Sequence, residues 1–169
     1  MSARRLAAVA SALLVSACLT APLRAEPVAI ALLSAEFRND HAELEPTTEA
    51  ERRRMDALAA NLRDSLAASG RYAVVEVGPE TRKRIAEDQK LGNCADCEIA
   101  YGRELGVAQV AWIEVQKVSN LILNLNVYIR PVEGGPARVR SVDIRGNTDE
   151  TWSRAMRYLV RNYVLKPAD

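Results

Sequence analysis

The sequence predicts a single α/β domain in which helices cover both faces of a mixed β-sheet, giving three layers. Strand-like and helix-like segments alternate in the first half of the chain, and this order places neighbouring strands parallel. Three strand-like runs then follow one another directly, which favours antiparallel pairing. A hydrophobic content of 49% over 169 residues excludes intrinsic disorder and is enough for one core. The expected order of elements is β-α-β-α-α-β-β-β-α.

Residues 1–25 are expected to be a secretory signal peptide rather than part of the fold. Arg4 and Arg5 precede an apolar stretch over residues 6–17, which is too short to cross a membrane but typical of a signal peptide. A cleavage site after residue 25 leaves a single domain over residues 26–169.

A competing cleavage site would attach the protein to a membrane. Residues 15–18 resemble the lipobox of bacterial lipoproteins, in which case the leader is residues 1–17 and Cys18 carries the lipid. Both sites predict export to the periplasm, as a soluble protein or as one anchored to the outer membrane through Cys18. No later apolar run is long enough for a spanning helix, so membrane attachment is expected only through this lipid.

Composition and missing motifs argue against several functional classes. The leader contains three arginines and no acidic residue, so its removal takes the net charge from +1 to −2. A near-neutral exported domain lacks the basic field that nucleic-acid binding requires. The sequence has no Gly-rich dinucleotide loop, phosphate loop or G-x-S-x-G motif, and His41 is its only histidine. We therefore expect no enzyme activity, no metal site and no cofactor.

The first half of the domain predicts two strands and three helices. An unbroken apolar run over residues 28–33 fits a strand buried on both faces, and an acidic irregular loop is expected over residues 34–47. Thr48 and Glu51 have capping-box spacing, and apolar residues then recur every three or four positions up to a Ser-Gly stop. The remaining elements are a strand over residues 72–77 and helices over residues 80–91 and 93–105.

The second half predicts three strands and a final helix. The strands cover residues 107–118, 121–130 and 138–145. Asn147 is positioned to cap the final helix, with Glu150 at the reciprocal position. The apolar stripe of this helix comprises Trp152, Met156, Leu159, Val160 and Tyr163. A basic stripe on its solvent side comprises Arg154, Arg157 and Arg161.

The register of the first hairpin follows from its alternating apolar residues. Leu121, Leu123, Leu125, Val127 and Ile129 share one face, and a two-residue turn would set Glu114 and Gln116 opposite them. A three-residue turn over residues 119–121 instead predicts the aliphatic pairs Val115–Leu125, Ile113–Val127 and Ala111–Ile129. The other face then carries the pairs Glu114–Asn126, Gln116–Asn124 and Trp112–Tyr128. We expect the leucines to face the core and the asparagines to face outward.

Cys94 and Cys97 form a Cys-x-x-Cys motif in the first turn of the predicted third helix. A helix N-terminus stabilises a thiolate, which allows thiol-disulfide chemistry, but the neighbouring Asp96 and Glu98 oppose it. One distant histidine does not complete a zinc site around two sulfurs. In an oxidising compartment we expect a short local disulfide or a buried thiol pair.

Polar residues at one end of the sheet are the candidates for contact with a partner. Asparagine is depleted in strands, so Asn124 and Asn126 indicate either a solvated surface with cross-strand amide pairing or a ligand contact. The turn before the last helix likewise has two interpretations, ordinary capping or recognition of a partner. The candidate contact residues are Lys117, Asn120, Asn124, Asn126, Arg145, Asn147 and Asp149.

Several segments resemble known envelope proteins. The run from Tyr101 to Ala108, the hairpin after it, and the run from Ser141 to Gly146 are similar to the TolB amino-terminal domain. The same module occurs in the curli-secretion lipoprotein family and in lipoprotein activators of peptidoglycan synthases. Residues 115–124 and 143–150, with the Cys-x-x-Cys followed by an acidic residue, more specifically resemble an uncharacterised exported bacterial family, a domain of unknown function.

This resemblance covers residues 26–169 and implies a three-layer α/β domain of anticodon-binding-domain-like topology. It also implies action through protein contacts, and it supplies no catalytic residues to carry over. We therefore expect a non-catalytic binding or adaptor domain with a protein partner in the cell envelope. Two alternatives remain open: a thiol-disulfide redox protein using Cys94 and Cys97, and a periplasmic domain that binds a small ligand between the sheet and the acidic loop.

Overall fold

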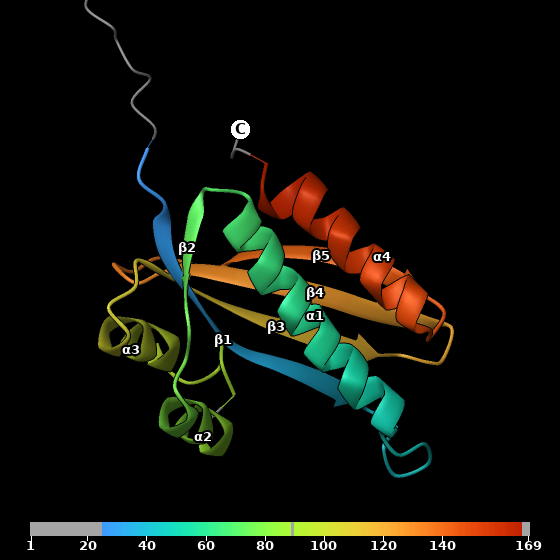
Figure 1. The fold of residues 1–169 in the computed structure, drawn as a ribbon. Helices are drawn as coiled ribbons and strands as arrows, with labels where there is room; N and C mark the ends of the chain where they lie inside the picture. Colours follow the sequence, from blue (N-terminus) through green and yellow to red (C-terminus); the bar gives the residue numbers. More distant parts are fainter. Residues whose placement is uncertain (1–24, 89, 167–169) are drawn as a thin grey trace, which may run out of the picture.

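A computed structural model describes residues 25–88 and 90–166 of the chain (Figure 1). The predicted lipidation site at Cys18 and the apolar part of the predicted leader lie outside these residues. Within the two ranges that are described, no helix is both long and apolar enough to cross a lipid bilayer.

The described residues form a five-stranded mixed sheet with the strand order β2-β1-β3-β4-β5. Strand β1 pairs in parallel with β2 on one side and with β3 on the other, whereas β3, β4 and β5 form an antiparallel meander. The strands are β1 Val28–Asn39, β2 Tyr72–Val75, β3 Gln109–Lys117, β4 Ile122–Pro131 and β5 Arg138–Arg145. The predicted mixed sheet and order of elements are confirmed.

Helices cover the sheet unequally on its two faces. On one face lie α1 Glu49–Ala68 and α4 Asp149–Leu159, which Figure 1 shows in front of the sheet. The chain continues from α4 as a π-helical turn, η1 Val160–Val164. On the other face lie two shorter helices, α2 Pro79–Glu87 against β1 and α3 Cys97–Glu104 against β3. The predicted three-layer architecture is therefore confirmed.

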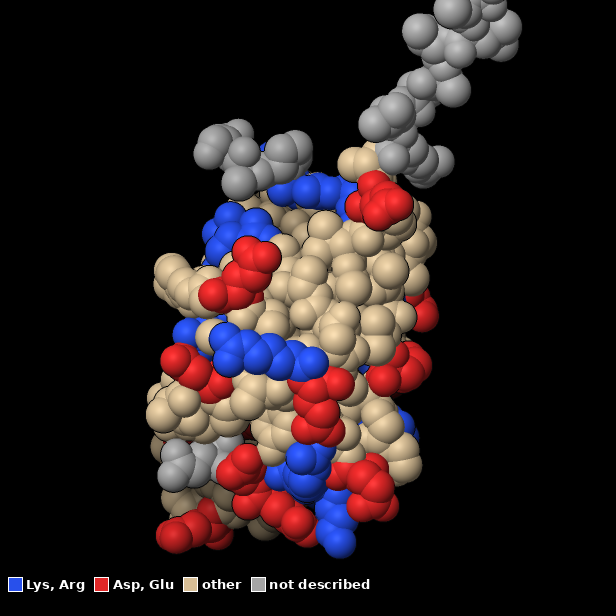
Figure 2. Space-filling model, turned by 90° about the vertical axis from the view of Figure 1, so that its left-hand side faces the viewer, with Lys and Arg blue, Asp and Glu red and all other residues tan. Residues whose placement is uncertain are grey.

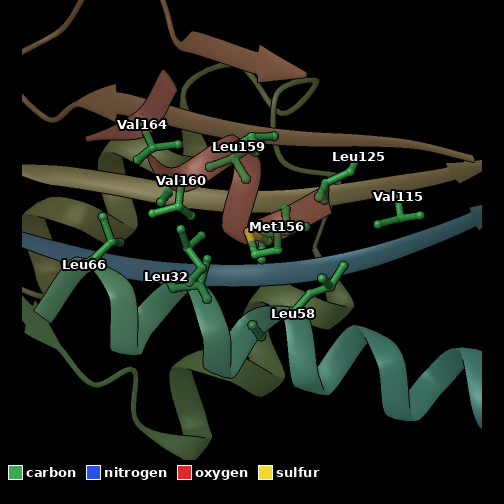
Figure 3. Close-up of a cluster of buried hydrophobic side chains, with 14 of the residues drawn as sticks. Leu32, Leu58, Leu66, Val115, Leu125, Met156, Leu159, Val160 and Val164 are labelled. Carbon is green, nitrogen blue, oxygen red and sulfur yellow. The ribbon is translucent and has the colours of Figure 1, made fainter. Parts of the chain in front are cut away.

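The main core fills the space between the sheet and the pair α1 and α4. Figure 3 shows side chains from both helices converging on side chains from β1, β3 and β4. Among them, Leu58, Leu125, Met156 and Leu159 are almost completely buried. A smaller core lies under α2 and α3, where Gly102 lets α3 approach Val110 and Val132 so closely that a Cβ atom would collide with them.

The register of the β3–β4 hairpin matches the predicted one pair for pair. Val115 lies opposite Leu125, and Glu114 lies opposite Asn126. Leu123 and Leu125 are buried, while Asn124 and Asn126 are partly exposed on the other face. Leu121 differs from the prediction, because it belongs to the turn and is exposed instead of sharing the buried face.

Strand β1 is longer than its apolar run indicated. The prediction of an irregular loop from residue 34 is wrong up to Asn39, since β1 continues along β3 after an irregularity between Leu32 and Ser34. Ala35 and Phe37 pack against the main core, while Glu36 is only partly buried and Arg38 is exposed. The extension is thus a half-buried strand, and such strands do not show a continuous apolar run.

Several element ends also differ from the prediction. Strand β2 ends at Val75 and α2 ends at Glu87, both earlier than expected. Helix α3 starts at Cys97 and not at residue 93, because Ala95 and Asp96 have φ values of 48° and 72°, which a right-handed helix cannot contain.

The predicted capping pair of the last helix is wrong as well. Thr148 is the N-cap of α4. Its hydroxyl accepts a hydrogen bond from the backbone N–H of Thr151, and the Thr151 hydroxyl accepts one from the backbone N–H of Thr148, which makes a capping box. The actual cap therefore begins one residue after Asn147. This shift frees the Asn147 side chain for a different set of contacts.

The surface on the side that carries β2 and α3 has charged side chains of both signs (Figure 2). Figure 2 shows Lys and Arg side chains there lying among Asp and Glu side chains around an uncharged area. A face of mixed charge does not attract a polyanion.

Candidate functional site

The seven predicted contact residues fall into two groups at the end of the sheet where the β3–β4 hairpin turns. Asn124, Asn126 and Arg145 lie on the outer face of β4 and β5. The others join a polar network between the hairpin, the β5–α4 turn and α1; they are Lys117, Asn120, Asn147 and Asp149.

The centre of the network is Glu51, a residue that the sequence indicated only as a capping residue. Its carboxylate is 1% exposed. One carboxylate oxygen accepts hydrogen bonds from the backbone N–H and hydroxyl of Thr48, at 2.7 and 3.0 Å. The other lies 3.0 Å from Lys117 Nζ and 2.8 Å from Asn147 Nδ2. We call Glu51, Lys117 and Asn147 the Glu51 cluster.

Lys117 is turned into the molecule and is only 4% exposed. The prediction placed it at the hairpin end as a contact for a partner, and its position explains why it is unavailable there. Along β3 it follows Ile113 and Val115 at every second position, so it points towards the same face as those buried residues. Its ammonium group is matched by Glu51 and by Glu45, which lies 3.4 Å away.

Asn147 joins three parts of the chain. Its Nδ2 group also lies 3.2 Å from Asn120 Oδ1, and its Oδ1 atom accepts hydrogen bonds from Trp152 Nε1 and from Arg54, both at 3.0 Å. Arg54 in turn pairs with Asp149 at 2.6 Å. The residue expected to cap α4 therefore connects α4 to α1 and to the hairpin.

The charged form of Glu51 is favoured in the folded protein. Burial by itself would raise the pKa of the carboxyl, but hydrogen bonds from Thr48, Lys117 and Asn147 outweigh it and lower the pKa from 4.5 to about 2. Burial would likewise lower the pKa of Lys117, and its contacts with Glu51 and Glu45 reverse the effect, so the pKa is raised. Each group thus holds the other in its ionised state.

We predict a loss of stability in acid that depends on this carboxylate. Because the pKa of Glu51 is lower in the folded than in the unfolded chain, its contribution is complete above pH 4.5 and disappears as the pH falls towards 2. The expected loss is about 3 kcal/mol at most. Urea denaturation of the wild type and of Glu51→Gln, repeated from pH 7 to 2, should show the steeper decline in the wild type. Parallel declines would contradict the prediction.

Around Asn124, Asn126 and Arg145 the outer face of β4 and β5 lies away from α2 and α3, and α3 reaches this face only near the other end of β4, where Glu98 pairs with Arg130. Helix α2 packs on β1 and α3 packs on β3, and Figure 1 shows both helices away from β5. Asn124 donates to Asp143 across the strands at 3.2 Å, and Arg145 donates to the same carboxylate at 2.8 Å. Asn126 accepts a hydrogen bond from Ser141. Cross-strand amide pairing therefore occurs at both asparagines.

Apolar side chains are exposed beside this face, at the tip of the hairpin. Leu121 is 74% exposed in the turn, and Val118 and Ile122 on either side are also exposed. Leu44 is exposed as well, in the loop after β1. The next residue, Glu45, accepts a hydrogen bond from Asn120 in the hairpin turn. We call Leu44, Val118, Leu121 and Ile122 the hairpin-tip patch.

Cys94 and Cys97 form a disulfide, as one of the two expectations for this pair stated. The left-handed residues Ala95 and Asp96 close the turn between them. Arg130 of β4 pairs with Asp96 and with the buried Glu98, both at 2.6 Å. The carboxylate of Glu98 lies near both sulfurs, but sulfurs joined in a disulfide are not the thiolates that zinc sites use.

Removing this disulfide should weaken the start of α3 without unfolding the domain. The double variant Cys94→Ala/Cys97→Ala is expected to lose about 2 kcal/mol, because the crosslink no longer restricts the unfolded chain. Urea denaturation measures the loss, and reduction of the wild type provides the control, which should show a similar decrease. Unchanged stability in both experiments would mean that the crosslink contributes nothing to folding.

A protein-family model matches residues 28–164 of this chain. The model is named DUF3280 and is described as a protein of unknown function (DUF2380). A search of curated proteins found no match.

Three solved structures match this chain over most of its length. The LpoB C-terminal domain from Salmonella enterica is 16% identical, with a TM-score of 0.48, and the match covers 75% of this chain and 89% of that one. The PelC dodecamer from Paraburkholderia phytofirmans is 8% identical, with a TM-score of 0.46 and coverage of 80% and 84%. Lipoprotein GNA1162 from Neisseria meningitidis is 13% identical, with a TM-score of 0.45 and coverage of 83% and 100%.

Proposed function

We propose that this chain, which belongs to the DUF3280 family of unknown function, is a non-catalytic adaptor domain of the bacterial envelope. In this role it binds a protein partner. The observation that carries the proposal is the hairpin-tip patch. Exposed apolar side chains that lie together on a soluble domain mark contact sites for other proteins.

The surroundings of the patch support the same proposal. Ile122 lies opposite Arg145 in the sheet, and Asn124 follows it on the same strand. An apolar centre with a rim of amide and charged groups is the usual composition of a protein–protein contact. In this proposal Asn120, Asn124 and Arg145 form that rim, whereas the buried Lys117 does not contribute to it.

The Glu51 cluster supports a structural role over a catalytic one. Glu51 and Lys117 would be a plausible acid–base pair by residue type alone. Their charged groups are nevertheless buried and matched to each other, so a substrate has no access to them. A general acid or base must come within hydrogen-bonding distance of the proton that it transfers.

Site-specific photocrosslinking in cells tests the proposed function. Leu121 is replaced by p-benzoylphenylalanine in the full-length chain with its own leader, and the control carries the same amino acid at Lys83, an exposed residue of α2. We expect a discrete light-dependent adduct with another protein from position 121 and none from position 83. If position 121 gives no adduct at wild-type protein levels, or gives the same adducts as position 83, the hairpin tip is not a contact site.

The envelope location is part of the proposal and is tested separately. The intact mass of the protein extracted from the envelope distinguishes a chain that starts after residue 25 from one that starts at a lipid-modified Cys18. Either mass supports an exported protein, soluble in the first case and anchored in the second. A mass that retains the whole leader would contradict export.

A further inference from the structure

Strand β5 leaves one side of its backbone without a strand partner in the described residues. It is the last strand in the sheet order and pairs only with β4, over eight residue positions. The opposite edge strand, β2, is only four residues long. A long unpaired strand edge is able to accept another strand by backbone hydrogen bonding.

The hydrogen bonds at the hairpin determine which backbone groups of β5 point outward. The N–H of Val118 donates to the carbonyl of Ile122, and the N–H of Gly146 donates to the carbonyl of Leu121. Since the bonded pairs alternate along antiparallel strands, Val142 and Ile144 direct their backbone groups towards β4. The backbone groups of Ser141, Asp143 and Arg145 therefore point away from the sheet.

A groove of about 450 Å³ runs beside this edge, between β5 and α4. Its apolar lining comprises Val142 and Ile144 from the strand and Ala155 and Tyr158 from the helix. The charged residues that line it are Arg145, Arg154 and Asp143, and Asp143 pairs with Arg145. Charged side chains alone can protect an edge strand from pairing with other strands. The apolar groove has no part in such protection, so it indicates that the edge binds a ligand.

Arginines dominate the charge along the same edge. Strand β5 carries Arg138, Arg140 and Arg145 against one acidic residue, Asp143. The exposed side of α4 and η1 adds Arg154, Arg157 and Arg161, and also Glu150, which pairs with Arg154. Within the described part of the chain, four of these six arginines make no ion pair; they are Arg138, Arg140, Arg157 and Arg161. This excess contrasts with the mixed charges on the side seen in Figure 2.

We propose that the β5 edge binds an extended acidic segment of a partner protein, which adds a sixth strand to the sheet and places apolar side chains in the groove beside α4. This inference rests on the proposed function for the statement that the partner is a protein. Its binding surface is a different one from the hairpin-tip patch. A second copy of this chain is disfavoured at the same edge, because two β5 strands would bring their arginines together.

Peptide selection with the purified domain over residues 26–169 tests this inference, with a phage-displayed library of random twelve-residue peptides as the probe. We expect selection of acidic sequences with alternating apolar residues. The affinity of a selected synthetic peptide should fall at least tenfold for Ser141→Pro, which removes an outward N–H from the edge without breaking the pairing with β4. It should fall similarly for Arg154→Glu, which reverses a charge at the groove.

Two matched variants serve as controls. Ser141→Ala removes the same hydroxyl as Ser141→Pro but keeps the backbone N–H. Arg103→Glu makes the same charge reversal as Arg154→Glu, but on α3. Both controls should bind the peptide like the wild type. Selection of basic peptides, failure to select any peptide, or equal binding by Ser141→Pro would overturn the proposal. The hairpin-tip variant Leu121→Asp should also bind normally, so a failure at the β5 edge is distinguishable from a failure of the proposed function.

Amide hydrogen exchange provides a readout that does not depend on a substitution. In the free domain the amides of Ser141 and Asp143 should exchange rapidly, while those of Val142 and Ile144 should be protected by β4. Addition of the selected peptide should protect the first pair and leave the second pair unchanged. Protection of Val142 and Ile144 alone would show that the peptide does not add to this edge.

Discussion

Replacing Glu51 with alanine is expected to destabilise the domain by about 3 to 5 kcal/mol. The substitution leaves Lys117 buried with only the more exposed Glu45 to balance it, and it removes an acceptor for Thr48 and Asn147. A buried charge without its partner is costly because it has lost its water and gained little in return. Urea denaturation at pH 7 measures the loss.

Two further variants distinguish the buried pair from a general helix effect. Glu49→Ala removes a carboxylate in the first turn of the same helix, but at an exposed position, and should change stability by less than about 0.5 kcal/mol. Glu51→Leu/Lys117→Met removes both charges together and should be more stable than Glu51→Ala. If Glu51→Ala and Glu49→Ala have equal effects, the Glu51 cluster does not hold these segments together.

Replacing Trp152 with alanine is expected to lower the free energy of unfolding by about 3 to 5 kcal/mol, as for Glu51→Ala. The side chain is 1% exposed and packs against Phe37 from the extended part of β1, with 5.7 Å between the ring centroids. Its N–H donates to Asn147, so the substitution opens a cavity and also removes one hydrogen bond from the Glu51 cluster. Thermal and urea unfolding measure the combined effect.

Variants with smaller effects separate these two contributions. Trp152→Phe retains most of the packing and loses the N–H donor, so its loss of stability should be clearly smaller than that of Trp152→Ala. Tyr158→Ala truncates an exposed aromatic residue on the same helix and should have little effect. Equal losses for Trp152→Ala and Tyr158→Ala would contradict the placement of Trp152 in the core.

The hairpin was predictable because its information is local. Alternating leucines specify which face of β4 is buried, and matching that face to the aliphatic residues of β3 leaves only one register. The extension of β1 was not visible in the same way. Its residues are half-buried, and their strand conformation depends on pairing with β3, more than 70 positions later in the chain.

The candidate site shows the same division between local and distant information. The spacing of Thr48 and Glu51 correctly indicated a capping box. That Glu51 also meets Lys117 depends on how α1 crosses β3, which local patterns do not contain. One signal was available: Lys117 follows Ile113 and Val115 at every second position, so alternation alone placed it on the apolar face.

Strand β1 is the first strand in the sequence, yet it lies inside the sheet between β2 and β3. Its backbone groups on the β3 side have no strand to pair with until the chain has been made as far as Lys117. Contacts between such distant segments slow folding, because a long loop must be closed before they form. During synthesis the amino-terminal segment therefore emerges well before its pairing partner, and the sheet can close only after most of the polypeptide has been made.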